Sequence, residues 1–455
     1  MDRRNARVIT LIVVVSCVMM TSLTSVYAGT GIQAKTDEYV HAWMEINRFS
    51  GAILLARDGE ILVNKGYGMA NYEHGIPNTS RTTFRIGSLT KSFTAAAIMM
   101  LQEQGKLSVN DPLSKYIPDN PNGDKIQLVH LLTHTSGIPD HTKLPGFYKD
   151  RRVYPFKLTE TIARFKNLPL EFAPGEKFSY SSSGYILLGY IIEQVTGMPY
   201  GDYLDRHIFT PLGMEGSGFE HADQVIPGMA SGYDYRDDMV VKAAYRNITN
   251  AHASGALYST TEDLYRWDRA LYTDKILSKG SLERMFTPYM DHYGYGWGIV
   301  DLFGRKMVAH NGDTEGFRSN ISRFPKDNVC IIILSNQEQA EVGRMSADLA
   351  AMLFGEDYTV PGVKKSITVA PDILDDYVGV YELQPNLFLT ISREDGRMYV
   401  QPTGQPRLEM FAETETDFFL KEVEVGISFV RDDSGAVNSL VFQQGGHQLT
   451  ATRTR

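Results

Sequence analysis

Ser88 and Lys91 have the residue types and the spacing of a nucleophile and its base. They stand three residues apart in the apolar segment Phe84 to Leu101, which predicts a buried helix that begins near Gly87 and ends before Gly105. Residues three apart share one helix face, so the hydroxyl and the amine should lie within reach of each other. An apolar setting disfavours the ammonium form, which would let Lys91 accept the Ser88 proton near pH 7.

The same two residues have a simpler interpretation, in which Ser88 only caps the helix and Lys91 is a solvated residue of its first turn. S-x-x-K alone is a weak pattern. Lys91 is, however, the only lysine with a serine three residues before it, and a charge in so apolar a helix needs a reason. The free N–H groups and the positive dipole end at this helix N-terminus would also stabilise an oxyanion.

Two further segments carry side chains suited to a site. The hydroxyl-rich loop Pro174 to Tyr185, which contains Tyr180 and Ser182, precedes an amphipathic helix that ends at Gly197. Taken alone, this loop could equally be a helix cap. The second segment is His310-Asn311-Gly312-Asp313, which belongs to a predicted hairpin of residues 297–303 and 306–310.

His130 and His134 have the helical i, i+4 spacing that could suit a metal ion. No glutamate stands between them, as the chemistry of zinc proteases would require. The pattern therefore favours a structural pair of histidines over a metal site.

The first elements of the chain should lead into the Ser88 helix. A helix capped by Thr36, with two acidic residues in its first turn, is expected to run to about Asn47. Residues 51–71 then predict a hairpin of alternating apolar and polar positions that turns at Asp58-Gly59.

The rest of the chain suggests a helical subdomain and a separate all-β domain. Residues 111–250 are loop-rich and helical, with many prolines and glycines. A strand at residues 328–335 and a helix near residues 343–354 follow the predicted hairpin. From about Asp372 the pattern changes to short alternating segments, which suit a small barrel. A length of 455 residues also indicates two or three domains.

The first 28 residues have the layout of a secretory signal peptide. Three arginines precede the apolar run Val8 to Met20, and Val26-Tyr27-Ala28 supplies a cleavage site. A membrane anchor is the alternative, but the apolar run is short for a span. Lipoprotein processing at Cys17 is less favoured because apolar residues continue after the cysteine.

The cysteine count and the net charge argue against a disulfide-bonded protein and against a nucleic-acid-binding protein. Only Cys330 remains in the body of the protein, so an internal disulfide is impossible and this residue is expected to be a small buried hydrophobe. Removing residues 1–28 removes one aspartate and three arginines, so the formal charge of -9 becomes -11. An acidic protein without a basic cluster does not suit a nucleic-acid partner.

Three segments in this order resemble the serine β-lactamase-like hydrolases, which include class C β-lactamases, D-Ala-D-Ala peptidases, D-aminopeptidases and esterases. Phe84 to Lys91 resembles the S-x-x-K element, Tyr180-Ser181-Ser182 the Y-x-N element, and His310-Asn311-Gly312 the K-T-G element. The resemblance covers roughly residues 40–355 and includes Leu131 to Gly137 as a flanking piece. The tail resembles, more loosely, the lipocalin-like domain found behind some of these enzymes.

The resemblance implies a role for each matching residue. Ser88 would attack a carbonyl, Lys91 would accept its proton, and Tyr180 would protonate the leaving group. The backbone N–H groups of Ser88 and Asp313 would form the oxyanion hole. The residues implied to contact the substrate are Ser182, His310, Asn311, Gly312 and Arg318. No metal or cofactor is required.

Departures from the family pattern bear on the substrate. Ser182 stands where the family usually has Asn, and His310 replaces the Lys that attracts a substrate carboxylate. Asp313 adds a negative side chain nearby, although Arg318 could compensate. A neutral or positively charged substrate therefore suits this site better than an anionic one. The alternative is that His310 is an ordinary hairpin histidine.

The sequence thus predicts an exported serine hydrolase, periplasmic or secreted, that acts on esters or on small peptides containing D-residues and acts weakly on β-lactams. The expected fold is an α/β domain, with an antiparallel sheet flanked by helices and a mainly helical subdomain, plus a small C-terminal all-β barrel. The expected parts of the chain are a signal peptide over residues 1–28, a serine hydrolase domain over residues 29–358 and a lipocalin-like β-barrel domain over residues 359–455. The alternatives are a carboxylesterase, a true β-lactamase or D-Ala-D-Ala carboxypeptidase, and a non-catalytic binding protein. No membrane span should remain after processing, and the oligomeric state stays open.

Overall fold

The computed structural model describes residues 31–454 except 146–153, 237–238, 363–365, 421–422, 424, 433 and 445–446. The predicted signal peptide, residues 1–28, and the Cys17 processing site therefore lie outside the described residues. The chain divides into two compact units between Pro361 and Gly362, and each unit is described by itself. Among the described residues, no helix is long and apolar enough to cross a membrane.

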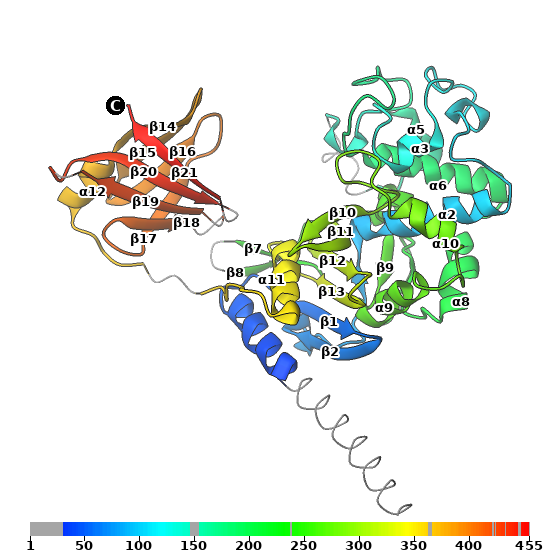
Figure 1. Ribbon diagram of the computed structural model, residues 1–455, viewed down its shortest axis with the longest axis horizontal. Coiled ribbons are helices and arrows are strands. Elements are labelled where there is room, and N and C mark those ends of the chain that lie inside the picture. Colours follow the sequence, from blue (N-terminus) through cyan, green and yellow to red (C-terminus); the bar gives the residue numbers. More distant parts are fainter. Residues whose placement is uncertain are drawn as a thin grey trace, which may run out of the picture. The chain divides into compact units, whose positions relative to one another are not determined.

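A six-stranded antiparallel sheet with the strand order β10-β11-β12-β13-β1-β2 forms the centre of the first unit (Figure 1). Its strands are β1 (Gly51–Arg57), β2 (Glu60–Tyr67), β10 (Gly298–Leu302), β11 (Arg305–Thr314), β12 (Phe317–Phe324) and β13 (Val329–Ser335). The two predicted hairpins are confirmed. Asp58 and Gly59 join β1 to β2 with positive φ angles of 52° and 85°, as a tight hairpin turn requires. The sequence analysis did not single out β12, which pairs with β11 and β13.

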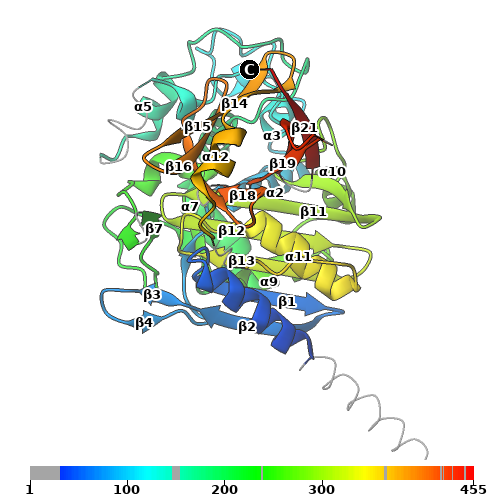
Figure 2. The ribbon, with the colours of Figure 1, turned by 90° about the vertical axis from the view of Figure 1, so that its left-hand side faces the viewer.

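Helices cover both faces of this sheet. Every residue of β13 is buried, and its side chains alternate between two hydrophobic cores, with Cys330, Ile332 and Leu334 in one and Ile331 and Ile333 in the other. Cys330 is thus the buried small hydrophobe that was expected. A helix over residues 31–45 and α11 (Val342–Phe354) cover one face, and α2 (Thr90–Glu103) and α9 (Thr261–Ala270) contribute to the core on the other (Figure 2). Strands buried on both faces carry continuous apolar runs instead of alternating ones.

The predicted cap at Thr36 is wrong. The chain is already helical at residue 31, and Thr36 Oγ1 donates a hydrogen bond of 2.8 Å to the Ile32 carbonyl within that helix. Thr36 is fully buried, and Ile32 packs against the same core. Tertiary packing of the preceding turn extends the helix beyond the local capping signal.

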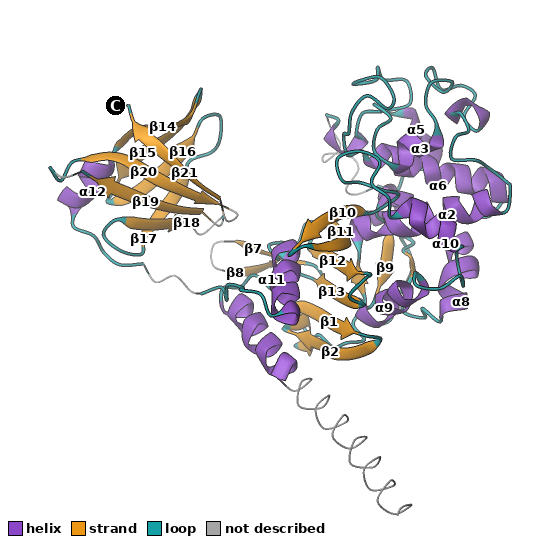
Figure 3. Ribbon diagram, viewed as in Figure 1, coloured by secondary structure: helices purple, strands orange, loops and turns teal. Residues whose placement is uncertain are grey.

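Most of the remaining described α-helices of the first unit, and some of its short strands, lie within residues 111–250, the segment predicted to be loop-rich and helical. Figure 3 shows that most of its helices gather beyond the β10 edge of the sheet. The remaining described α-helices are α3 (Leu128–Leu132), α5 (Leu158–Ala163), α6 (Ser182–Thr196), α7 (Tyr200–Leu204), α8 (Thr210–Leu212) and α10 (Lys279–Met285). The short strands are β3 (Met69–Asn71), β4 (Ile76–Pro77), β5 (Phe84–Arg85), β6 (Gly218–Phe219), β7 (Tyr233–Arg236), β8 (Met239–Lys242) and β9 (Leu257–Ser259).

The second unit is a closed barrel of eight strands, which confirms the expected all-β barrel. The strands are β14 (Gly379–Gln384), β15 (Leu387–Glu394), β16 (Arg397–Pro402), β17 (Leu408–Ala412), β18 (Asp417–Leu420), β19 (Val425–Arg431), β20 (Val437–Gln444) and β21 (His447–Arg453). The strands do not begin at Asp372 as expected, because α12 (Pro371–Tyr377) comes first. Tyr377 at its end is fully buried and stacks on Phe429 with ring centroids 4.1 Å apart. The barrel therefore has its own packed hydrophobic core.

Because each unit has a separate core, we expect a fragment of residues 29–360 to remain soluble and to keep its reactivity. The measurement is covalent labelling of Ser88 by a fluorophosphonate, followed by intact-mass spectrometry beside the full-length chain. An insoluble or unreactive fragment would show that the barrel is needed by the first unit.

Candidate active site

Ser88 and Lys91 meet at the start of the buried helix. Ser88 lies in a 3-10 turn, Gly87–Leu89, that leads directly into α2, and Lys91 lies in the first turn of α2. Lys91 Nζ donates hydrogen bonds to Ser88 Oγ at 3.0 Å and to the Ser254 carbonyl at 2.8 Å. The predicted buried helix is confirmed, and the structure excludes a solvated Lys91 because this residue is 0% exposed.

The surroundings of Lys91 favour its neutral form. Its Nζ lies 4.9 Å from the centroid of the Tyr180 ring and 5.6 Å from that of Tyr185. Burial lowers the pKa of Lys91 to about 7, with Asp140 opposing this effect and the charge of Arg246 adding to it. A substantial fraction of Lys91 is therefore neutral at pH 7 and able to accept a proton from Ser88.

Tyr180 lies two residues before the first residue of α6 and faces the same site. Its ring packs against His134 with centroids 4.1 Å apart. Burial raises the pKa of Tyr180 above its ordinary value, and the hydrogen bond with Ser88 only partly offsets this. The phenol is therefore protonated at neutral pH and can donate a proton.

The third motif lies on β11, beside the turn that carries Ser88. A Cβ atom on Gly312 would lie 2.0 Å from the Ile86 carbonyl oxygen, and one on Gly87 would lie 2.7 Å from the Asp313 nitrogen. Gly87 also has a φ of +49°. Glycine at both positions therefore lets the two backbones approach each other closely.

His310 is buried and neutral. Burial, together with the positive charge of Lys91, lowers the pKa of His310 to about 4 against a smaller opposing effect of the Asn311 carbonyl. His310 Nδ1 lies 2.6 Å from the Asn311 carbonyl oxygen, and Nε2 lies 2.9 Å from the Tyr293 hydroxyl. The Nδ1 N–H must donate to this carbonyl, which leaves Nε2 to accept from Tyr293. His310 therefore offers no positive charge to a substrate at pH 7.

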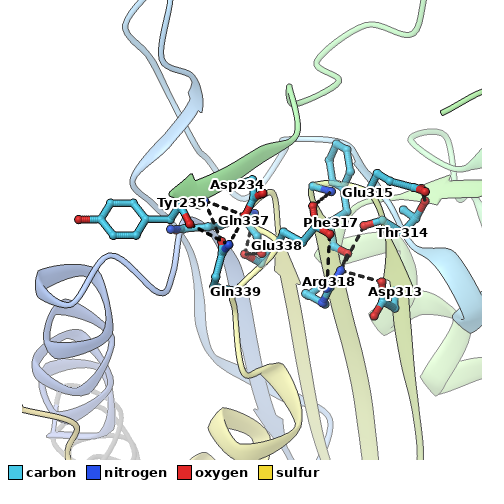
Figure 4. A network of polar contacts seen from close by, with 12 residues as sticks. Asp234, Tyr235, Asp313, Thr314, Glu315, Phe317, Arg318, Gln337, Glu338 and Gln339 are labelled. Atoms are coloured by element: carbon cyan, nitrogen blue, oxygen red, sulfur yellow. Dashed lines mark hydrogen bonds and ion pairs between the residues drawn. The ribbon is translucent and has the colours of Figure 1, made fainter. Parts of the chain in front are cut away.

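Arg318 is engaged by groups of the protein (Figure 4). Its Nη1 donates to Asp313 Oδ1 at 2.7 Å and to the carbonyls of Thr314 and Phe317, and its Nη2 lies 4.0 Å from Glu338 Oε1. The Asp313 side chain is 73% exposed, so its carboxylate is also open to solvent. Arg318 is thus balanced by acidic groups and is poorly placed to replace the missing lysine.

Most of the predicted site residues line a cavity of about 540 Å³. Ser88, Tyr180, His310, Asn311 and Asp313 line it. Lys91, Ser182, Gly312 and Arg318 do not, although Lys91 lies directly behind Ser88. The other lining residues are Tyr293, Gly298, Val300, Met307, Ala309, Asn320, Ser322, Gly343, Ser346 and Ala347.

The sequence analysis did not identify Tyr293, which lines the cavity and contacts His310, as a site residue. The helical spacing of His130 and His134 is also not realised in the structure. Helix α3 ends at Leu132, and His134 has a φ of +57°, so His130 and His134 do not continue one helical face. His130 Nδ1 instead accepts from the Gln127 N–H within the helix cap. In the described part of the chain, no group of three or more His, Cys, Asp or Glu side chains is placed to hold a metal ion.

Comparison with known proteins identifies the family of each part of the chain. The family profile described as Beta-lactamase matches residues 36–355, and a domain of unknown function, DUF3471, matches residues 363–453. Penicillin-binding protein 4* of Bacillus subtilis is 31% identical over 438 residues, which cover 90% of this chain and 96% of that protein.

Two solved structures are similar as well. The octameric penicillin-binding protein homologue from Pyrococcus abyssi has a TM-score of 0.67 and 27% identity, with 92% of this chain and 99% of that chain covered. The D-amino acid amidase from Ochrobactrum anthropi, solved with L-phenylalanine amide, has a TM-score of 0.62 and 25% identity, with 72% of this chain and 98% of that chain covered.

Proposed function

The chain belongs to the Beta-lactamase family of serine hydrolases, and we propose that it cleaves amide or ester bonds through an acyl-enzyme on Ser88. The observation that carries this proposal is the distance of 3.0 Å between Lys91 Nζ and Ser88 Oγ in a fully buried setting. A protein that only binds a ligand needs no such pair of nucleophile and base.

The proposed reaction has two halves. In the first, neutral Lys91 takes the Ser88 proton while Ser88 Oγ attacks the substrate carbonyl, and the N–H groups of Ser88 and Asp313 stabilise the oxyanion. Tyr180 then donates its proton to the leaving group and recovers one from the Lys91 ammonium. In the second half, a water molecule attacks the ester of Ser88 and loses a proton to the same groups. The bond between Ser88 Oγ and the acyl carbon then breaks, and that proton passes to Ser88 Oγ as the acid leaves.

We propose a neutral or amine-bearing substrate, such as a short ester or a small amide or peptide with a D-residue. The neutral His310 and the exposed carboxylate of Asp313 support this substrate, because neither attracts an anion. The similarity to a D-amino acid amidase supports the D-residue. A carboxylesterase of the same fold remains the second candidate because the Ser88 mechanism is the same for esters.

Intact-mass spectrometry after incubation with a fluorophosphonate and, separately, with penicillin tests the proposal. We expect stoichiometric labelling of Ser88 by the fluorophosphonate and slow acylation by penicillin. Rapid penicillin turnover would indicate a β-lactamase, and a stable penicillin adduct formed rapidly would indicate a D-Ala-D-Ala carboxypeptidase. An unlabelled protein would point to a non-catalytic binding protein.

Replacing His310 with lysine should shift the preference toward anionic substrates. The new ammonium could pair with a carboxylate near the reacting carbonyl, and such a charge-assisted contact is worth ~1.5 to 3 kcal/mol, or roughly ten- to a hundred-fold in selectivity. The measurement is kcat/KM for a penicillin and for a p-nitrophenyl ester in both proteins. Efficient penicillin hydrolysis by the unmodified protein would refute the assignment.

We propose export through residues 1–28 to the periplasm or the medium, with a hydrolase domain over residues 29–358 and a lipocalin-like domain over residues 359–455. The arginine-led apolar run supports export. The closed eight-stranded barrel supports the second domain.

A further inference from the structure

The Ser254 carbonyl, which accepts a hydrogen bond from Lys91 at 2.8 Å, belongs to an irregular segment, Ile248–Ser254. The neighbouring carbonyl of Ala253 accepts a bond of 2.7 Å from Thr94 Oγ1 on α2. Two successive carbonyls of this segment are therefore bound to the helix that carries Lys91. Their direction depends on the backbone immediately before them.

That backbone is unusual at His252, whose φ is 42° and ψ is -133°. These angles are typical of glycine at the first central position of a type II′ turn and cost energy for any other residue. The His252 carbonyl accepts from the N–H groups of Gly255 and Ala256 at 3.1 and 2.9 Å, so a second turn follows directly. A histidine can keep this conformation only if other interactions of the residue favour it.

The imidazole supplies such interactions. His252 Nε2 lies 3.3 Å from Glu193 Oε1, and the ring lies against Tyr200 and Phe219 with centroid distances of 5.1 and 5.6 Å. The His252 side chain is 12% exposed. Glu193 Oε1 also accepts from the Tyr200 N–H at 3.0 Å. Burial raises the pKa of Glu193, but its contacts with His252 and Tyr200 outweigh this and hold the pKa below its usual value.

A second cavity, of about 210 Å³, borders the same residues. His252, Glu193, Tyr200 and Phe219 all line it. The ring therefore borders open space on one side, while its Nδ1 and Cε1 atoms lie close to Gly189 of α6 on another. The position of the Ser254 carbonyl then depends on that bond more than it would in a filled core.

We propose that His252 and Glu193 are a positioning pair that holds the Ser254 carbonyl, and through it Lys91 Nζ, in place beside Ser88. Glu193 lies on α6, the helix that follows Tyr180, so the pair also connects the two sides of the site. Neither residue touches the reacting atoms. The inference rests on the proposed role of Lys91 as the base.

The test compares His252→Ala with His252→Gly. Both variants lose the imidazole, but only glycine adopts the native backbone angles at little cost. We expect the alanine variant to lower the rate of Ser88 acylation by a fluorophosphonate about tenfold, and the glycine variant to stay within about threefold of the unmodified protein. Glu193→Ala should resemble the alanine variant, with KM for an ester substrate nearly unchanged in all three.

The pH profile separates positioning from a loss of stability. Without its carbonyl acceptor the Lys91 ammonium is less stable, so the acid limb of kcat/KM should move to lower pH in His252→Ala and return in His252→Gly. Asp140 and Arg246, the charged groups that act on Lys91, are unchanged in these variants. His221→Ala, at an exposed residue that lines the second cavity, is the matched control and should keep the parent profile.

Equal rates in the alanine and glycine variants, or an unmoved acid limb in His252→Ala, would overturn the inference. Thermal melting shows which variants are folded at the assay temperature, and the glycine variant keeps the test informative if alanine unfolds. If the unmodified protein is not labelled at Ser88 at all, the proposed function fails. If it is labelled and the variants behave like it, only the positioning role fails.

Discussion

Replacing Ser88 with alanine should abolish turnover of every substrate while leaving the fold intact. The change removes one hydroxyl that contacts Lys91 and lines the cavity, and it removes the only atom proposed to attack the substrate. We expect kcat/KM to fall by about 10³-fold or more, as for other serine nucleophiles. The measurement is kcat/KM on the best ester found, together with fluorophosphonate labelling followed by mass spectrometry.

Ser92→Ala is the matched control for this prediction. Ser92 lies four residues later, is buried, and donates to the Leu89 carbonyl at 2.8 Å. Its loss should cost about 1 kcal/mol of stability and leave kcat nearly unchanged. Turnover by Ser88→Ala comparable to that of Ser92→Ala would remove Ser88 from the mechanism.

Replacing Lys91 with arginine should be nearly as damaging as losing the nucleophile. A guanidinium stays charged at every practical pH and cannot accept the Ser88 proton. It is also larger than the amine in a fully buried site bordered by the rings of Tyr180 and Tyr185. We expect a loss of about 10³-fold in acylation rate, comparable to that caused by removing a catalytic base.

The pH dependence provides a second measurement of the same residue. The base is the neutral amine, so with a pKa of about 7 the rate should rise as pH increases through neutrality. About a tenth of Lys91 is neutral one pH unit below its pKa and about nine tenths one unit above it. The Lys91→Arg variant should lack this rise between about pH 5 and pH 9.

Lys65→Arg is the matched control for the lysine substitution. Lys65 is partly exposed and pairs with Asp37 at 2.9 Å, so arginine should replace it with little effect on activity. Efficient catalysis by Lys91→Arg at neutral pH would mean that Lys91 acts only through its charge, and another base would be required.

The sequence by itself determined the elements whose signals are local. The turn at Asp58-Gly59 and the glycine that ends the Ser88 helix, Gly105, are properties of a few adjacent residues. The S-x-x-K spacing likewise places two side chains on one helix face wherever that helix lies. These features, the family resemblance and the C-terminal barrel could therefore be predicted before any tertiary contact was known.

Tertiary structure decided the features that depend on residues distant in sequence. Burial by residues distant in sequence lowers the pKa of Lys91 to about 7, and its amine donates to a carbonyl 163 residues away. His310 is neutral because it is buried near Lys91, and its Nε2 accepts a hydrogen bond from Tyr293, for which no motif signalled a role. Arg318 is occupied by Asp313 and Glu338. The structure differs from two predictions. Thr36 lies inside a helix and does not cap it, and His134 has a positive φ and does not continue the helix of His130. In both places tertiary packing overrides the local sequence preference. Charge state, hydrogen-bond partners and solvent access are set by what surrounds a group in space, and a linear pattern contains only its neighbours along the chain.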